Sequence, residues 1–254
     1  MESNAMTGQQ VLDSGTLREH QEGRPPRDRP FSIRRLGPAD LDAIDDLQRR
    51  IVTSLQDPSL YHPNPRERLA QCLGQEGLMI GTLVDDQPIG FRSIFYPGSR
   101  PDNLGRDIGL PAQDLATVAH LERSAVLPAY TGNRLQIRMT GQALKIAVAE
   151  HRLRHLFSTV APGNAASILD KFAVGLLIVR AMKKYGDLWR FIFHRDLDDP
   201  IAIIPETAIE VPAPDLATQV RLVEEEGYIG SALREEDHGV IMVYARPARP
   251  IRRS

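Results

Sequence analysis

The sequence predicts a mixed α/β fold of the α+β class, in which helices flank a mainly antiparallel central sheet. Two pairs of apolar runs are each joined by a short polar turn, which indicates β-hairpins. Helical spacing recurs before, between and after these pairs, so strands and helices do not alternate regularly as they do in a doubly wound sheet. With 254 residues, of which 42% are apolar, the chain is long enough for a sizeable core.

The first 30 residues are polar, contain several Gly, Pro and Arg residues and show no periodicity. This composition predicts a flexible N-terminal arm over residues 1–30. Its opening letters, MESNAM, resemble a cloning remnant, with Met6 as the native start. A main domain is expected over residues 31–198. Residues 199–254 are expected to form a C-terminal extension that packs against it.

The main domain begins with an alternating run at residues 31–36, which indicates a strand. Gly37 and Pro38 break the chain, and apolar residues at helical spacing then predict a helix up to residue 55. The remaining elements of this half are a short helix and a hairpin, expected at residues 66–73, 78–84 and 89–96.

The second half opens with a long polar loop at residues 97–114 and a strand at residues 115–127. Loops of this length in compact domains are usually functional or disordered. The later elements are expected, in order, as a helix at 134–151, a strand at 156–161, a helix at 165–172, a hairpin at 175–182 and 188–193, a helix at 215–226 and a strand at 240–245.

Charge and cysteine content exclude several classes of protein. Lys and Arg number 31 and Asp and Glu 33, so no overall field would attract nucleic acid or an anionic membrane surface. No run approaches the ~20 apolar residues of a membrane span, and the cytoplasm is the expected location. Cys72 is the single cysteine, and its position on the apolar face of a short helix predicts a buried thiol. No metal site is expected.

The segment VLPAYTGNRLQ, residues 126–136, lies between a predicted strand and a long predicted helix. The first amides of a helix have no intrahelical acceptor, and a strand-loop-helix turn can direct several of them at one spot. Together with the helix dipole, these amides form an anion site that suits a pyrophosphate.

This segment resembles the acyl-CoA loop of the GNAT superfamily of N-acyltransferases, whose usual form is V-x-P-x-Y-(R/Q)-x-x-G-x-(G/A). The residues that match are Val126, Pro128, Tyr130 and Gly132. The segment departs from the pattern at Thr131, where Arg or Gln is usual, and at Arg134 and Gln136, where small residues are usual. The loss of these small residues implies a widened loop in which Arg134 supplies charge-assisted contacts.

Two further landmarks extend the resemblance over residues 31–197. A strand ends in V-x-x-x-N at Asn164, and Gly175 follows eleven residues later, where the family opens its last hairpin. The resemblance implies a GNAT-type fold that binds acetyl-CoA or another acyl-CoA as co-substrate. The residues that it implies for the cofactor are Val126, Leu127, Thr131, Gly132, Asn133, Arg134, Leu135, Gln136 and Asn164.

Acyl transfer to an amine requires a group that keeps the amine neutral. Strand alternation places His120, Glu122 and Val126 on one face of the predicted strand. Related enzymes often carry a Glu four residues before the valine, so Glu122 is the expected general base and His120 is the reserve. The alternatives are that Glu122 pairs with an Arg or faces solvent, and that His120 makes a structural hydrogen bond.

The leaving thiolate requires a proton donor. Many relatives have a Tyr seven residues after the landmark Asn, and this spacing leads to Lys171. Lys171 is therefore the expected donor, unless it is a solvated helix lysine or binds the phosphates of the cofactor. Tyr185 and solvent are the other candidate donors.

Acceptor binding is expected in the variable loops. One candidate is Tyr61 in the loop before the second helix. The candidates in the long loop over residues 97–114 are Asn103, Arg106 and Asp107, and for Arg106 the alternative is a solvated charge.

The sequence thus predicts transfer of an acetyl or other short acyl group from CoA to a primary amine of a small molecule or peptide. The alternative is a non-catalytic acyl-CoA-binding protein, acting as a sensor or scaffold on the same fold. Relatives are often dimers, so a homodimer is a further expectation, with residues 199–254 either forming or blocking that contact.

Overall fold

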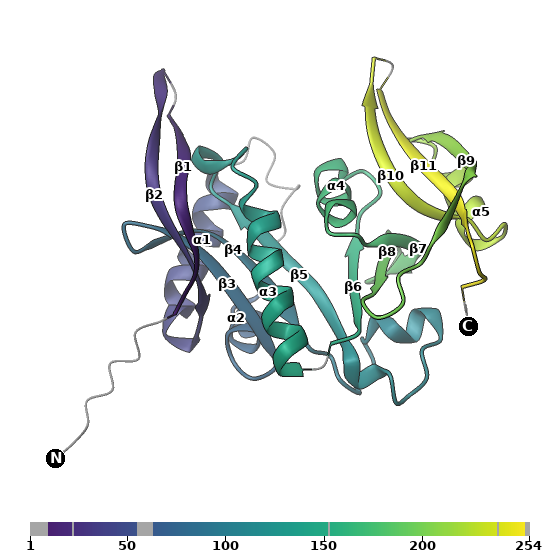
Figure 1. The fold of residues 1–254 in the computed structure, drawn as a ribbon, viewed down its shortest axis with the longest axis horizontal. Coiled ribbons are helices and arrows are strands. Elements are labelled where there is room, and N and C mark those ends of the chain that lie inside the picture. The colour runs from purple at the N-terminus through teal and green to yellow at the C-terminus, as the bar shows by residue number, and fades with distance from the viewer. Residues whose placement is uncertain (1–9, 22, 55–62, 152, 238, 252–254) are drawn as a thin grey trace. The chain divides into compact units, whose positions relative to one another are not determined.

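The computed structural model of the protein describes residues 10–21, 23–54, 63–151, 153–237 and 239–251. The chain divides into two compact units, each assembled from two stretches of sequence. The first comprises residues 1–95 and 122–146, and the second comprises residues 96–121 and 147–254. Strand β5 (Val118–Val126) and helix α3 (Leu135–His151) therefore contribute residues to both units (Figure 1).

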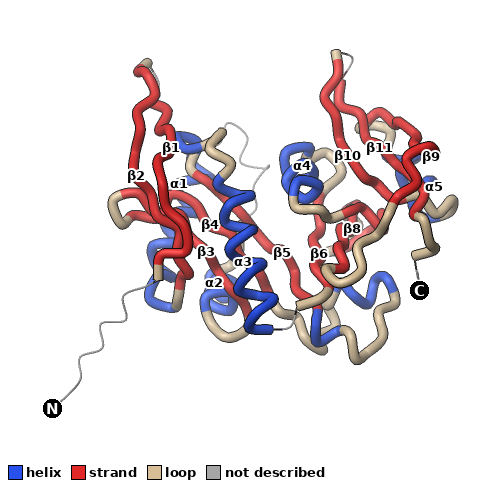
Figure 2. Tube along the Cα trace, viewed as in Figure 1, coloured by secondary structure: helices blue, strands red, loops and turns tan. Residues whose placement is uncertain are grey.

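In the first unit, strands β1 to β4 form an antiparallel sheet in chain order, followed by the end of β5. The bounds are β1 (Val11–Gln21), β2 (Arg24–Leu36), β3 (Gly77–Val84) and β4 (Gln87–Phe95), with helices α1 (Leu41–Ser54) and α2 (Arg66–Leu73). Helix α1 packs against β4 and α2 against β3, while α3 crosses the opposite face (Figures 1 and 2). Because both faces are covered, every residue of β3 is buried.

The local sequence explains the boundaries of these elements. Helix α1 buries Ile44, Leu47 and Ile51, which lie at helical spacing and form one face. The turn between β3 and β4 places Asp85 and Asp86 in the left-handed region, as a two-residue hairpin turn of the primed type requires. The predicted helices and hairpin of this unit are confirmed.

In the second unit, the beginning of β5 pairs in parallel with β6, and the pairings among the other described strands are antiparallel. The strand order is β5-β6-β8-β7-β10-β11-β9. The bounds are β6 (His155–Val160), β7 (Leu177–Lys184), β8 (Leu188–Asp196), β9 (Ile203–Pro212), β10 (Ile229–Glu236) and β11 (Gly239–Pro247), with helices α4 (Ala165–Ala173) and α5 (Leu216–Glu224). The sheet of the protein is thus mixed and mainly antiparallel, as predicted.

The core of the second unit is continuous from β5 to β10. Its buried residues are Leu104, Ile108, Val118, Phe157, Val179, Ile192 and Ile229. The long loop after β4 contributes Leu104 and Ile108 through a short 3₁₀ helix, η3 (Leu104–Ile108). Part of the predicted polar loop is therefore core structure.

The N-terminal prediction is wrong within the described residues. Residues 11–21 and 24–30 are strands of a hairpin rather than a flexible arm, and Leu17 is buried. Three prolines and several charges remove the alternating pattern by which a strand is recognised. Pro25, Pro26 and Pro30 lie where β2 pairs with β1, before its pairing with β3 begins at Ser32.

The C-terminal extension is also more regular than predicted. Its helix and last strand are confirmed as α5 and β11, but β9 and β10 were not expected. Strand β10 pairs with β7 at Gly230 and Ile178, so these strands continue the sheet of the second unit. The contact is close, because a Cβ on Gly230 would lie 2.8 Å from the Ile178 side chain.

Candidate functional site

The connection between β5 and α3 lies wholly in the first unit. The Leu127 amide donates to the Ile89 carbonyl of β4 at 2.8 Å, which holds the start of the loop against the sheet. A short 3₁₀ helix, η5 (Pro128–Tyr130), follows. Gly132 and Arg134 then both adopt positive φ angles, 81° and 54°, before the helix begins. These two left-handed residues reverse the chain into α3.

The loop leaves the start of α3 open. The Arg138 amide donates to the Arg134 carbonyl at 3.1 Å, so the amides of residues 135–137 precede the helical hydrogen-bond series. Thr131, Gly132 and Arg134 are exposed, and a Cβ on Gly132 would find nothing within 4 Å. Open amides at the positive end of the helix dipole fit the diphosphate of an acyl-CoA.

Arg134 occupies a glycine-like conformation. Its φ of 54° is one that a glycine adopts without strain, and it stands where the resembled family has glycine. The backbone geometry is therefore retained although the glycine is not. The exposed Arg134 side chain adds a cationic group beside the open amides.

The other predicted cofactor residues are less open. Leu127 and Leu135 are buried. The Asn133 amide group is hydrogen-bonded to the main chain of β1, so only its backbone is available to a ligand. The Gln136 side chain is half-buried, and the main-chain carbonyl of Gln136 accepts from the Thr140 hydroxyl at 2.8 Å.

Strand β5 places Glu122, Ser124 and Val126 on one face, by strand alternation. Glu122 is half-buried. The Ser124 hydroxyl oxygen is buried and has no hydrogen-bond partner among the described residues. Gly90 lets β4 approach this end of β5 closely, because a Cβ there would lie 2.9 Å from the Val126 side chain.

Cys72 is buried, as predicted, and is not activated. Burial and the nearby Glu122 carboxylate raise the pKa of the Cys72 thiol to about 12. Both effects disfavour the thiolate, which is the nucleophilic form. This cysteine therefore stays protonated near neutral pH and serves as a core residue.

His120, the reserve base, lies in the second unit and has a structural contact. Its Nε2 atom accepts a hydrogen bond from the Leu104 amide at 3.0 Å, and the side chain is buried. This contact ties β5 to η3. It corresponds to the alternative of a structural hydrogen bond.

Lys171 lies in α4 and is not a solvated helix lysine, because it is only 4% exposed. Its Nζ atom donates to the Asp170 carboxylate at 2.7 Å. Asn164 caps this helix, since its side-chain oxygen accepts from the Ser167 amide at 2.9 Å. Helix α4 of the second unit is therefore capped at its N-terminus by Asn164 and carries the buried Lys171 amino group.

The candidate acceptor residues of the long loop mainly hold the loop together. Asn103 is 1% exposed and donates to the Gly98 and Leu115 carbonyls. The Asp107 carboxylate pairs with Lys184, while the exposed Arg106 donates to carbonyls of the same loop. We therefore assign Asn103 and Asp107 a structural role. Tyr61 lies outside the described residues.

A buried histidine pair, which the sequence pattern did not indicate, lies between β6 and β8. His155 Nδ1 and His194 Nε2 are 3.1 Å apart, and His194 stacks on Phe157. Burial lowers the pKa of His194 to about 3 and also lowers the pKa of His155. Asp196, which is paired with Arg154, lies 3.8 Å from His155. Both rings are therefore neutral at pH 7.

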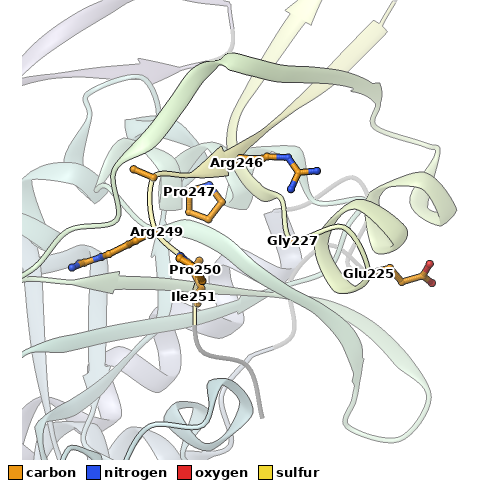
Figure 3. A pocket seen from close by; sticks show the side chains of 8 residues that line it. Glu225, Gly227, Arg246, Pro247, Arg249, Pro250 and Ile251 are labelled. Carbon is orange, nitrogen blue, oxygen red and sulfur yellow. The ribbon is translucent and has the colours of Figure 1, made fainter.

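A pocket of about 310 Å³ lies at the C-terminal end of the second unit. Figure 3 shows the side chains of Glu225 and Arg249 pointing to opposite sides of it. Arg249 pairs with Asp199, and Arg246 packs over the Tyr228 ring. None of the predicted site residues lines this pocket.

The part of the chain that the structure describes lacks two further features. It contains no group of three or more His, Cys, Asp or Glu side chains arranged to hold a metal ion. Within the same described ranges, no helix has both the length and the apolar character needed to cross a membrane.

No protein-family model matches the sequence, and no curated protein matches it. Solved structures do. Arabidopsis thaliana NAA60 in complex with acetyl-CoA matches with a TM-score of 0.54 at 13% identity, over 66% of this chain and 99% of that chain. An acetyltransferase of the GNAT family from Streptococcus pneumoniae matches with a TM-score of 0.50 at 14% identity, over 65% of this chain and 98% of that chain.

Ribosomal-protein-S5-alanine acetyltransferase from Vibrio fischeri matches with a TM-score of 0.50 at 15% identity, over 68% of this chain and 96% of that chain. The mixed sheet, its helices and these neighbours define the class: the fold is that of the GNAT N-acyltransferases. Almost the whole length of each neighbour matches within about two-thirds of this chain, which therefore carries additional structure.

Proposed function

We propose that this protein transfers an acetyl or other short acyl group from CoA to a primary amine of a small molecule or peptide. One observation supports this most strongly. On a GNAT fold, the loop after β5 turns through left-handed Gly132 and Arg134 and leaves the first amides of α3 open. These amides and the Arg134 guanidinium would hold the diphosphate of the acyl-CoA.

Glu122 is the proposed general base. A primary amine is mostly protonated at pH 7, and only its neutral form can attack a thioester. A half-buried carboxylate on β5 would take this proton, directly or through a water molecule. His120 is a weaker candidate, because its Nε2 lone pair already accepts from the Leu104 amide.

The thioester carbonyl requires hydrogen-bond donors as negative charge develops on its oxygen. The main chain near Val126 and the Ser124 hydroxyl are the proposed donors on the same strand. Ser124 suits this role because its buried hydroxyl has no hydrogen-bond partner among the described residues. Attack then forms the C–N bond and breaks the C–S bond, with the thiolate as leaving group.

Lys171 is the proposed donor of the proton that the thiolate receives. It stands where the resembled family has a tyrosine donor, and it is buried rather than solvated. Its Nζ atom pairs with the Asp170 carboxylate, and a neighbouring negative charge favours the ammonium, which is the form that can give a proton. An ammonium that becomes an amide loses two protons: Glu122 would take one before the attack, and the second would leave the nitrogen to water once the C–N bond has formed. Lys171 would give one proton to sulfur.

The test begins with calorimetric titration of acetyl-CoA and CoA, followed by turnover with a panel of amines. We expect micromolar binding, and a loss of kcat of about 100-fold or more in Glu122→Gln. Glu76→Gln is the matched control, because this exposed carboxylate also lies near Cys72 but not on β5. Binding without turnover of any amine would favour the acyl-CoA sensor, and no binding at millimolar concentration would overturn the proposal.

The role of Lys171 has its own test. Lys171→Met removes the proton but keeps an unbranched side chain, so kcat should fall while the Kd for CoA is unchanged. Lys171→Tyr installs the donor of the resembled family and should restore activity. Equal activity in Lys171→Met and the unaltered protein would leave solvent as the donor.

A further inference from the structure

The N-terminal hairpin contacts the cofactor loop directly, although residues 11–30 have no pattern that predicts order. Strand β1 lies beside the connection between β5 and α3 (Figure 1). The Tyr130 hydroxyl donates to the Glu19 carboxylate at 2.9 Å, and both side chains are buried. Tyr130 belongs to the loop and Glu19 to β1, so this bond joins residues that are 111 positions apart.

A second contact joins Asn133 to the free edge of β1. The Arg18 amide donates to Asn133 Oδ1 at 2.8 Å, and Asn133 Nδ2 donates to the Arg18 carbonyl at 2.8 Å. Among the strands that the structure describes, β1 is the first of its sheet and pairs only with β2. The side-chain amide of Asn133 therefore acts as a substitute for a neighbouring strand, satisfying a donor and an acceptor at once.

A third contact reaches the first turns of α3. The Arg138 guanidinium donates to both oxygens of Asp13, at 2.7 and 2.9 Å, in a bidentate ion pair. The same guanidinium lies 4.6 Å above the centre of the Phe31 ring in β2. Both strands of the hairpin thus hold the start of this helix.

The Glu19 end of this arrangement stays charged over a wide pH range. Hydrogen bonds from Arg27 foremost, and also from Tyr130 and Arg29, lower the pKa of Glu19 to about 2. The carboxylate is therefore ionised at any pH at which the protein would be assayed. Its bond to Tyr130 is then a charge-assisted one, stronger than a bond between neutral groups.

Asn133 lies between the two left-handed residues of the loop, Gly132 and Arg134. Left-handed geometry at a non-glycine residue persists only where the surroundings impose it. The hydrogen bonds from Asn133 to β1 fix the residue between Gly132 and Arg134, where the chain reverses. They therefore hold Arg134 in a left-handed conformation that a glycine would adopt without strain.

We propose that the β1–β2 hairpin is a positioning element for the acyl-CoA diphosphate, acting through Asn133 and Tyr130. The inference rests on the proposed function, because it names the structure that fixes the cofactor loop. Asn133 and Tyr130 are positioning residues in it: their side chains bind β1 and Glu19, and the loop amides between and after them would bind the ligand.

The experiment compares two acyl donors in Asn133→Ala and Tyr130→Phe. Acetyl-CoA carries the diphosphate, and acetyl-pantetheine lacks it. We expect the Kd for CoA to rise about tenfold or more in Asn133→Ala, and less in Tyr130→Phe. Turnover with saturating acetyl-pantetheine should fall much less than turnover with acetyl-CoA, because this donor lacks the diphosphate that the loop would hold. Asn133→Asp keeps the acceptor for the Arg18 amide but loses the donor to the Arg18 carbonyl. Its Kd for CoA should therefore lie between those of the unaltered protein and Asn133→Ala.

Asp40→Asn is the matched control for a general loss of stability. Asp40 forms a half-buried ion pair with Arg34 in the same unit but contacts no loop residue. It should lower the melting temperature without changing the Kd for CoA. Circular dichroism shows whether each variant is folded. If Asn133→Ala is not folded, the two acyl donors are compared in Tyr130→Phe instead.

The outcomes separate this inference from the proposed function. If the unaltered protein binds CoA and the Asn133→Ala and Tyr130→Phe variants bind it equally well, the hairpin is not a positioning element. If both acyl donors lose activity in parallel, the role of the hairpin is structural only, and the inference is again wrong. If the unaltered protein does not bind CoA, the proposed function fails first, and the inference fails with it.

Discussion

The two hairpins near the ends of the described chain are built on opposite principles. Over the described part of residues 11–30 in β1–β2, Leu17 is the one buried apolar residue, and contacts to the rest of the first unit run through Asp13, Glu19 and the main chain of Arg18. In β10–β11, the contacts within the second unit are mainly apolar. The buried residues there are Ile229, Leu233, Met242, Tyr244 and Ala245.

This difference shows what a hydrophobic pattern can and cannot reveal. Strand β11 was predicted at VIMVYA, an apolar run, and three residues of this run, Met242, Tyr244 and Ala245, are buried. Residues 1–30 were predicted as a flexible arm, whereas the strand at residues 31–36 was expected. In residues 11–30, specific polar partners 111 to 125 positions away in sequence take the place of an apolar face. A polar composition is thus compatible with order where the partners are supplied by another part of the fold.

The largest expected effect is on the apolar hairpin. Ile229 is fully buried in the core cluster, so Ile229→Ala should lower the free energy of unfolding by about 3 kcal/mol through lost transfer energy and a cavity. Urea denaturation followed by circular dichroism measures this. Ile203→Ala removes the same atoms from a side chain that is 36% exposed and should cost less than about 1 kcal/mol. Equal losses would contradict the contrast in burial.

The next effect is on pH dependence, which should differ between the two units. The lowered pKa of His194, about 3, means that the unfolded chain binds a proton below pH 6.5 while the native state does not. Stability is therefore complete above pH 6.5 and falls toward pH 3, by up to about 1.4 kcal/mol per pH unit for this group. His155 shifts in the same direction and adds to the slope.

Chemical denaturation between pH 7.5 and 5 tests this expectation. His194→Gln should flatten the slope, because glutamine cannot take up a proton. His20→Gln makes the same substitution at an exposed position of β1 and is the matched control. The Glu19 contacts lie in the first unit and matter at lower pH, because the stability that they contribute is lost only as pH falls from 4.5 toward 2. Loss of CoA binding at pH 5.5 before any loss of second-unit structure would contradict this order.

A smaller effect is expected from the polar hairpin itself. Glu19→Gln removes the carboxylate that pairs with Arg27 and Arg29, although Arg29 keeps Asp85, and weakens the bond to Tyr130, at a cost of about 1–2 kcal/mol. Because Arg27 is partly exposed, 1 M NaCl should reduce the difference from the unaltered protein. Asp28→Asn, at an exposed position of β2, should have no measurable effect. A cost that is independent of salt would mean that packing, rather than charge, holds this hairpin.

The smallest effect on stability, and the sharpest separation from binding, is expected at Arg134. Arg134→Gly relieves a left-handed side-chain conformation and should change the free energy of unfolding by less than about 1 kcal/mol, in the stabilising direction. The same change removes a guanidinium, so the Kd for CoA should rise severalfold. Thermal unfolding and calorimetry measure the two quantities on one sample. Tighter CoA binding would show that the backbone, not the charge, limits affinity.

The sequence alone determined the helices, turns and loops whose formation depends on local sequence patterns. Periodic apolar residues predicted α1 and α4, the paired aspartates predicted the turn between β3 and β4, and the motif at residues 126–136 predicted the loop before α3. The resemblance that this loop and Asn164 support led to the fold that the solved structures also have. These features have one cause: backbone geometry and burial on one side produce recognisable patterns among residues that are neighbours in the sequence.

Only the tertiary structure decided the features that depend on distant partners. Lys171 is buried rather than solvated, Asn133 is committed to β1, and His155 meets His194 across β6 and β8. No local pattern marks such contacts, because each joins groups far apart in the chain. The identity of a polar residue does not show whether water or another residue forms its hydrogen bonds, because the surrounding fold decides this.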